Sequence, residues 1–194
     1  MKIIGLTGPT GAGKSTVSDA LRAHGLYIAD GDAAARAIMQ PGSPVLAELA
    51  QAFGADILLP DGSLDRKALA ARAFASPEQT ALLNRLTHPA IDRILFAGIE
   101  AHADRPAAVI DAAALIESGM DQKCDLLAVV LAPLDVRLRR IMARDGLTRE
   151  EAMLRVGAQK DDAFYSSRAD VVLCNDGAHD LRSEIEKILE RIPL

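Results

Sequence analysis

The chain contains few aromatic residues and few cysteines. Its 194 residues include no tryptophan, two tyrosines, four phenylalanines and two cysteines. Cys124 and Cys174 form no CxxC pair, and no histidine stands at a spacing typical of a metal site. A disulfide-built fold is therefore excluded, and we expect two free thiols in a reducing cytoplasm and no zinc.

Long apolar runs and an excess of positive charge are also missing. No segment is apolar over the length that a bilayer requires, which predicts no membrane association. The net charge of −5 argues against a general nucleic-acid-binding surface. Met1 and Lys2 lead directly into an apolar segment, so we expect no signal peptide. With 49% hydrophobic and 25% charged residues, the composition is typical of an ordinary globular protein.

A glycine-rich phosphate loop is the most informative feature that the chain does have. Residues 8–15, GPTGAGKS, fit the pattern G-x-x-x-x-G-K-[ST] between a predicted strand at residues 3–6 and a predicted helix at residues 16–21. Glycines allow backbone N–H groups to curl around phosphate oxygens, and the helix N-terminus adds partial positive charge. Lys14 can reach the outer phosphates, and the Ser15 hydroxyl can bind Mg²⁺. A glycine-rich turn with a surface lysine is the weaker alternative, because strand and helix are correctly placed.

Five apolar runs predict the sheet. The first precedes the phosphate loop, and the others are residues 26–29, 107–111, 126–131 and 171–173. Helical stretches separate them, which indicates an α/β fold with a mostly parallel five-stranded sheet flanked by helices. Together with the loop, this predicts a P-loop nucleoside triphosphate hydrolase fold. We expect a single domain over residues 1–194, whose core is residues 1–31 and 106–194.

Two helical insertions are predicted between these runs. Residues 32–105 contain no convincing strand but several capped helices, including one after Ser43-Pro44 and one after a capping box at Ser76. His88-Pro89 is expected to end the latter helix and begin another. A helix from about Asp135 to Arg144 is followed by a capping box at Thr148 and a polar helix to about Lys160. This charged hairpin, residues 145–165, is predicted to be a lid.

Acidic residues follow two of the predicted strands. Asp111 ends one strand and could support Mg²⁺ or its bound waters, or it could simply cap the following loop. Asp30 and Asp32 follow the second strand, where they could orient a substrate hydroxyl and take its proton. Arg36 could meet a substrate phosphate. An N-terminal helix cap by Asp32 with an Asp32–Arg36 surface pair explains the spacing equally well.

Four arginines crowd the helix before the lid. Arg140 and Arg144 stand at i and i+4, so they share a helix face, where their mutual repulsion would be offset by a polyphosphate. Arg137 and Arg139 are expected to face solvent. The alternative for all four is a solvated basic surface near the C-terminus of the helix.

The ordered set of motifs resembles the dephospho-CoA kinase family over nearly the whole chain. The shared segments, in chain order, are residues 5–16, 30–36, 41–42, 53–54, 61–66, 83–91, 115–117 and 140–145, then Gln159, residues 169–170 and Asn175. The family often has D-x-P-L-L-F-E where residues 111–117 read DAAALIE. The resemblance implies transfer of phosphate from ATP to the ribose 3′-hydroxyl of dephospho-CoA in the cytoplasm, with residues 32–105 as the acceptor-binding subdomain.

The resemblance also implies roles for individual residues. The catalytic residues would be Lys14, Asp32 and Arg140. Ser15 would bind Mg²⁺ directly, and Asp111 would bind it through water. The nucleotide would be bound by Gly11, Ala12, Gly13, Lys14, Ser15, Thr16, Arg144 and Asn175. The acceptor would be bound by Asp32, Arg36, His88 and Glu117, although His88 could equally stabilise a turn. The oligomeric state stays open, with a monomer favoured.

Two other functions share part of this sequence pattern. A kinase with another acceptor, such as a nucleotide or nucleoside, would share the phosphate loop. A nucleotide-dependent switch like a small GTPase would need the motifs N-K-x-D and D-x-x-G, and neither is found in the chain. A helical insertion after the second strand also suits an acceptor site better than a switch loop.

Overall fold

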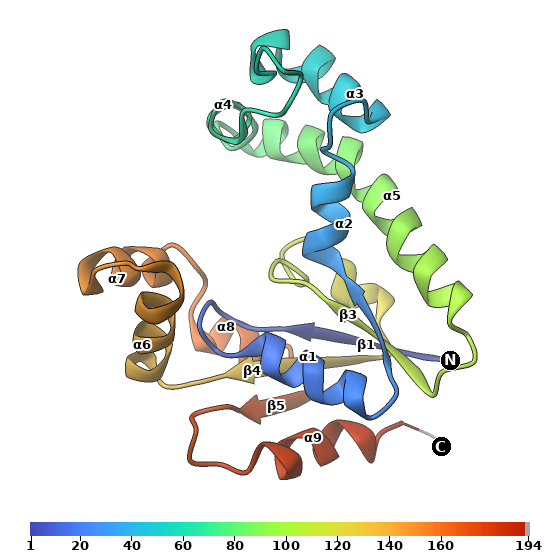
Figure 1. Cartoon of the computed structure of the whole chain (residues 1–194), viewed down its shortest axis with the longest axis vertical. Coiled ribbons are helices and arrows are strands. Elements are labelled where there is room, and N and C mark those ends of the chain that lie inside the picture. The colour runs from blue at the N-terminus through green and yellow to red at the C-terminus, as the bar shows by residue number, and fades with distance from the viewer. Residues whose placement is uncertain (193–194) are drawn as a thin grey trace. The chain divides into compact units, whose positions relative to one another are not determined.

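The computed structural model describes residues 1–192 and centres on a five-stranded parallel sheet (Figure 1). The strands are β1 (Lys2–Thr7), β2 (Tyr27–Asp30), β3 (Ala107–Asp111), β4 (Leu126–Leu131) and β5 (Val171–Cys174). Their order in the sheet is β2-β3-β1-β4-β5, so β1 is central. The predicted α/β class and the five predicted strands are confirmed.

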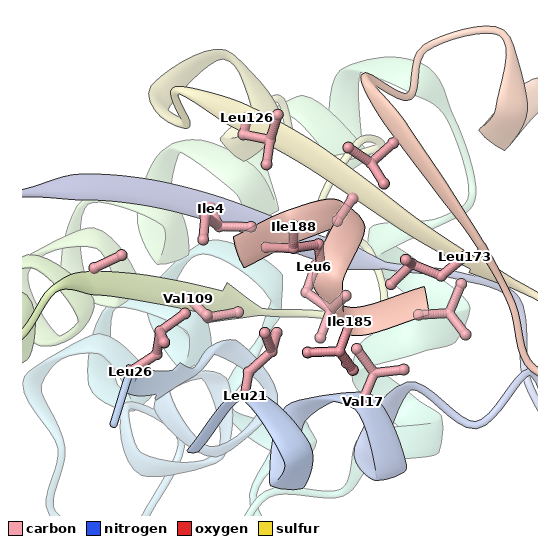
Figure 2. Close-up of a cluster of buried hydrophobic side chains, with 14 of the residues drawn as sticks. Ile4, Leu6, Val17, Leu21, Leu26, Val109, Leu126, Leu173, Ile185 and Ile188 are labelled. Carbon is pink, nitrogen blue, oxygen red and sulfur yellow. The ribbon is translucent and has the colours of Figure 1, made fainter. Parts of the chain in front are cut away.

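The strands are largely apolar because both faces of the central part of the sheet are covered. On one face, α1 (Lys14–Ala23) and α9 (Leu181–Leu189) pack against alternate residues of the strands, as Figure 2 shows for Ile4 and Leu6 of β1. Val17 and Leu21 of α1 and Ile185 of α9 complete this buried cluster. The core therefore holds the start of α1, and with it the phosphate loop, against the sheet.

The opposite face of the sheet is covered by the segment that follows β3. Gly5 alternates with Ile4 and Leu6 along β1 and so points to this face. A Cβ at Gly5 would lie 2.8 Å from the side chain of Leu115 and 3.0 Å from the Cys124 sulfur. The close approach of Leu115 fixes where the chain runs after Asp111. The short 3₁₀ helix η2 (Met120–Lys123) then leads into β4.

Residues 30–100 form a second compact unit, distinct from the unit made by residues 1–29 and 101–194. The second unit is helical: its elements are α2 (Gly31–Ala37), α3 (Pro44–Phe53), η1 (Ala55–Ile57), α4 (Arg66–Ala73) and most of α5 (Pro77–Ala101). Leu49, Phe53, Ile57 and Leu69 form its core. The predicted acceptor-binding role of residues 32–105 stays a prediction.

The sequence wrongly predicted a break at His88-Pro89. α5 runs through Pro89 as one helix of 25 residues. Proline removes one N–H and frees the carbonyl four residues earlier, that of Arg85. Pro89 is exposed, so water can reach the freed carbonyl. Inward-facing Leu95 and Ile99, which are buried, continue the helix beyond the proline.

The segment after β4 contains three helices, α6 (Leu134–Asp145), α7 (Arg149–Gly157) and α8 (Asp162–Ser166). The capping box at Thr148 is present: Thr148 and Glu151 bond reciprocally to each other's backbone N–H. The predicted polar helix ends at Gly157 rather than Lys160, and α8, which the sequence analysis missed, begins after a cap at Asp161. Within residues 1–192, no helix is long and apolar enough to cross a bilayer.

Candidate functional site

The glycine-rich loop connects β1 to α1 at the centre of the sheet. Gly11 and Gly13 have φ angles of 79° and 91°, in the left-handed region that favours glycine. A Cβ at Gly11 would lie 2.7 Å from the Arg137 carbonyl oxygen, so the missing side chain also lets α6 approach the loop. Gly13 caps α1 without a side-chain hydrogen bond. The helix N-terminus is therefore suited to bind an anion, as the motif predicts.

Asp111 lies beside the loop and contacts two residues of α1. β1 and β3 pair in parallel with Leu6 opposite Asp111, which brings the Asp111 carboxylate to the loop. Lys14 forms an ion pair with one carboxylate oxygen, and the Ser18 hydroxyl donates to the other. Ser18 was not predicted, although its spacing of four from Lys14 places both on one helix face. Ser15 and Thr16 are exposed at the start of α1.

Arg140 reaches the loop from α6. Its Nη1 donates to the carbonyl oxygens of Ala12 at 3.1 Å, Gly11 at 3.3 Å and Asn175 at 2.9 Å. The Asn175 side chain accepts from Nη2 at 3.3 Å and donates to the Gly13 carbonyl at 3.3 Å. Asn175 directly follows β5, so the carboxyl ends of three strands contribute residues to one cluster around the loop.

The four arginines of α6 do not form one basic face. Arg144 is exposed and makes a two-pronged pair with the neighbouring Asp145, at 2.8 and 2.9 Å. This pair raises the pKa of Arg144 and lowers that of Asp145. Arg139 is exposed, as expected, but the expectation for Arg137 was wrong: its side chain is only 5% exposed. Its position four residues before buried Ile141 was a signal for an inward face.

Glu117 lies between β3 and η2 and contacts α8. The Tyr165 hydroxyl donates to a Glu117 carboxylate oxygen at 3.3 Å. Tyr165 is fully buried. Burial first, and then the nearby Glu117 charge, raises the pKa of Tyr165 to about 12, so the hydroxyl stays protonated and able to donate.

Three predicted acceptor-binding residues lie in the second unit. Asp30, rather than Asp32, caps α2, because its carboxylate accepts from the Ala33 N–H at 2.7 Å. Arg36 lies 3.8 Å from Asp30 and so does not make the surface pair with Asp32 that the spacing allowed. Asp32 is exposed in the first turn of α2. His88 is partly buried within α5 rather than in a turn.

One group of potential metal ligands lies in the turn after β5. Ligand atoms of Cys174, Asp176 and His179 lie within 4.8 Å of one another, although the spacing of the histidines in the sequence shows no metal-ligand pattern. Asp176 accepts from the backbone N–H of Ala178 and His179 and from the His179 ring, and these bonds hold the pKa of its carboxyl well below the usual range. The same contacts close the turn between β5 and α9.

Comparison with known proteins identifies the family. The family model described as dephospho-CoA kinase matches residues 2–180. The chain is 47% identical over 192 residues to a dephospho-CoA kinase of Corynebacterium glutamicum, covering 97% of this chain and 96% of the relative. A dephospho-CoA kinase of Anaeromyxobacter dehalogenans is 46% identical, with 92% and 85% covered.

Solved structures agree with this assignment. A Thermus thermophilus protein has 34% identity and a TM-score of 0.79, covering 98% of this chain and 95% of its own. Dephospho-CoA kinase from Campylobacter jejuni has 26% identity and a TM-score of 0.66, with 98% and 97% covered. A shikimate kinase from Bacteroides thetaiotaomicron, at 16% identity and a TM-score of 0.52, shares the fold. The family match over residues 2–180 and the 47% identity over nearly the whole chain show that this chain belongs to the dephospho-CoA kinase family.

Proposed function

We propose that this protein transfers the γ-phosphate of ATP to the ribose 3′-hydroxyl of dephospho-CoA, which yields coenzyme A. The observation that carries the proposal is the cluster of Lys14, Asp111, Arg140 and Asn175 around the glycine-rich loop, in a chain whose family is established. Phosphoryl transfer needs positioned positive charge more than covalent participation by the protein. The cluster provides such charge at a helix N-terminus.

Lys14 and Arg140 are the proposed phosphate-binding cations. In the structure, Lys14 pairs with Asp111, and a bound triphosphate would compete for the same ammonium group. The Arg140 guanidinium is held against the loop by carbonyl oxygens, so its charge is fixed before the nucleotide binds. Backbone N–H groups of residues 11–16 are proposed to bind phosphate oxygens, and Asn175 and Arg144 to complete the nucleotide site.

The oxygen groups beside the loop fit Mg²⁺. The Ser15 hydroxyl is exposed at the start of α1. The Asp111 carboxylate, at the end of β3, accepts from Ser18, which lies one turn after Ser15 on α1. Mg²⁺ prefers a few protein oxygens with waters and substrate phosphates as further ligands. Ser15 would bind the ion directly and Asp111 through water. When bound, Mg²⁺ would neutralise charge on the transferred phosphate.

The acceptor is proposed to bind to the second unit. Asp32 would orient the 3′-hydroxyl and accept its proton. Arg36, His88 and Glu117 are the other proposed acceptor-binding residues. The exposed Asp32 carboxylate is not used as a helix cap, because Asp30 has that role, so its oxygens stay available. We further propose that the protein acts as a cytoplasmic monomer.

The decisive experiment measures ADP release with Mg²⁺-ATP and a panel of acceptors: dephospho-CoA, AMP, adenosine and shikimate. We expect acceptor-dependent ADP only with dephospho-CoA, and a product with the phosphate at the 3′ position by mass spectrometry and NMR. ADP release with AMP or adenosine but not dephospho-CoA would refute the acceptor. Slow hydrolysis without any acceptor dependence would refute kinase activity. Light scattering tests the monomer.

A further inference from the structure

The peptide groups of Thr10, in the middle of the glycine-rich loop, are held by two side chains from distant parts of the chain. The Thr10 N–H donates to Gln159 Oε1 at 2.7 Å, and the Thr10 carbonyl accepts from Arg137 Nε at 3.0 Å. Gln159 lies between α7 and α8, and Arg137 lies on α6. We call these two contacts the Thr10 clamp. None of the roles proposed above uses it.

Arg137 is built into the fold rather than placed on its surface. Its side chain is 5% exposed, and a second arm, Nη1, donates to the Asp162 carboxylate at 3.0 Å. Asp162 opens α8, so Arg137 joins the loop to the start of that helix. Burying a guanidinium is costly unless it is paired and hydrogen-bonded. Within residues 1–192, Nη2 of Arg137 is buried and has no protein acceptor.

The loop requires external support because of its composition. Glycine loses more conformational entropy than other residues when the backbone becomes ordered, and Gly8, Gly11 and Gly13 lie on both sides of Thr10. Bonds to both the N–H and the carbonyl of Thr10 fix the two peptide planes that precede Gly11. A nucleotide that binds a loop already fixed does not have to order it.

We infer that Arg137 and Gln159 are positioning residues for the nucleotide loop: they order it through Thr10 and so raise its affinity for the triphosphate of ATP. Neither residue is assigned a contact with the nucleotide. Because Gln159 is supplied by the α7–α8 connection, the order of the loop depends on that connection staying in place. The inference extends the proposed function but requires only that the loop binds ATP.

The test uses Gln159→Met and Arg137→Met, which keep side-chain length and remove the hydrogen bonds. Calorimetric ATP affinity of the folded variants is expected to fall about two- to tenfold for Gln159→Met and about ten- to hundredfold for Arg137→Met. Arg139→Met is the matched control, since Arg139 lies on the same helix, is exposed and, in the part of the chain that the structure describes, pairs with Asp135 alone. We expect its ATP affinity to change less than about twofold.

Two further readouts separate positioning from a merely structural role. KM for ATP should rise while KM for the acceptor stays unchanged, whereas general destabilisation would move both. The double variant should lose less affinity than the product of the two single losses, because both side chains act on Thr10. Wild-type ATP affinity in folded Gln159→Met would overturn the inference, and so would a loss equal to that of Arg139→Met.

The outcome does not depend on the acceptor. If Arg137→Met fails to fold, Gln159→Met and Arg137→Lys decide the question, and Arg137→Lys is expected to recover only part of the affinity because it cannot bond to Thr10 and Asp162 together. If the wild-type protein does not phosphorylate dephospho-CoA, the proposed function fails, while the calorimetric comparison still tests the clamp.

Discussion

Replacing Gly11 with alanine would test how closely α6 packs on the phosphate loop. The φ angle of Gly11 is 79°, and an added Cβ would lie 2.7 Å from the carbonyl oxygen and 3.0 Å from the Cα of Arg137. The left-handed backbone costs an L-residue about 1–2 kcal/mol. Crowding against backbone atoms of α6 adds about 1–3 kcal/mol, since a helix backbone cannot move aside as a flexible side chain can.

Gly146→Ala is the matched control. Gly146 ends α6 with a φ of 67°, and nothing lies within 4 Å of a Cβ built there. Both variants place alanine in a left-handed backbone conformation and both reduce the entropy of the unfolded chain. The difference between their unfolding free energies therefore isolates the cost of crowding against α6. For a chain of this size, 1–3 kcal/mol corresponds to a further decrease in Tm of about 2–12 °C for Gly11→Ala.

Differential scanning calorimetry of both variants and the wild type provides the measurement. We also expect ATP affinity to fall only in Gly11→Ala, because the crowded residue lies within the loop. Equal decreases in Tm for Gly11→Ala and Gly146→Ala would show that α6 does not pack against the loop as described.

Four further predictions follow from the site. Lys14→Ala removes a charge-assisted phosphate contact worth about 1.5–3 kcal/mol in binding and should nearly abolish kcat with an unchanged circular dichroism spectrum; near-normal turnover would contradict it. Arg140→Lys keeps the charge but cannot reproduce the hydrogen bonds to Ala12 and Asn175, so kcat/KM for ATP should fall at least about tenfold. An unchanged kcat/KM would mean that Arg140 has no role in the reaction. Asp32→Asn should lower kcat by about two orders of magnitude with little change in ATP affinity, and a defect confined to ATP affinity would exclude it as the base. The pKa of Asp176 is lower in the folded protein than in the unfolded chain, so its carboxylate stabilises the fold at pH values above the unfolded-state pKa, and this stabilisation is lost as the pH falls through the folded-state pKa. The difference in Tm between the wild type and Asp176→Ser should therefore shrink below about pH 4, and a difference that does not change with pH would refute the linkage.

Local patterns were sufficient to predict most of the fold. The apolar runs at residues 107–111 and 126–131 predict β3 and β4 because strands covered on both faces are mostly apolar. The capping box at Thr148 predicts the start of α7 because its bonds are local. The break at Pro89 was predicted wrongly, since the sequence does not reveal that the proline faces solvent.

The candidate site was less predictable because its contacts join distant segments. The phosphate loop and Lys14 are encoded in eight consecutive residues, but the partners of Asp111 depend on the pairing of β1 with β3. Arg137 was expected to face solvent, whereas the packing of α6 on Gly11 places it inside. Similarly, the contact between Tyr165 and Glu117 spans 48 residues and leaves no periodic signal.

The central position of β1 divides the sheet into a protected middle and two edges. β1 pairs with β3 along residues 2–6 and with β4 along residues 4–7, so its amides can exchange with solvent only when the sheet opens on a neighbouring side. The edge strands β2 and β5 each have one neighbour; β2 ends at Asp30, and Asn175 directly follows β5. Slow hydrogen exchange in β1 and faster exchange in β2 and β5 would mean that the glycine-rich loop is anchored to the least mobile strand. The residues at the ends of the two edge strands would then be able to shift without disturbing that anchor.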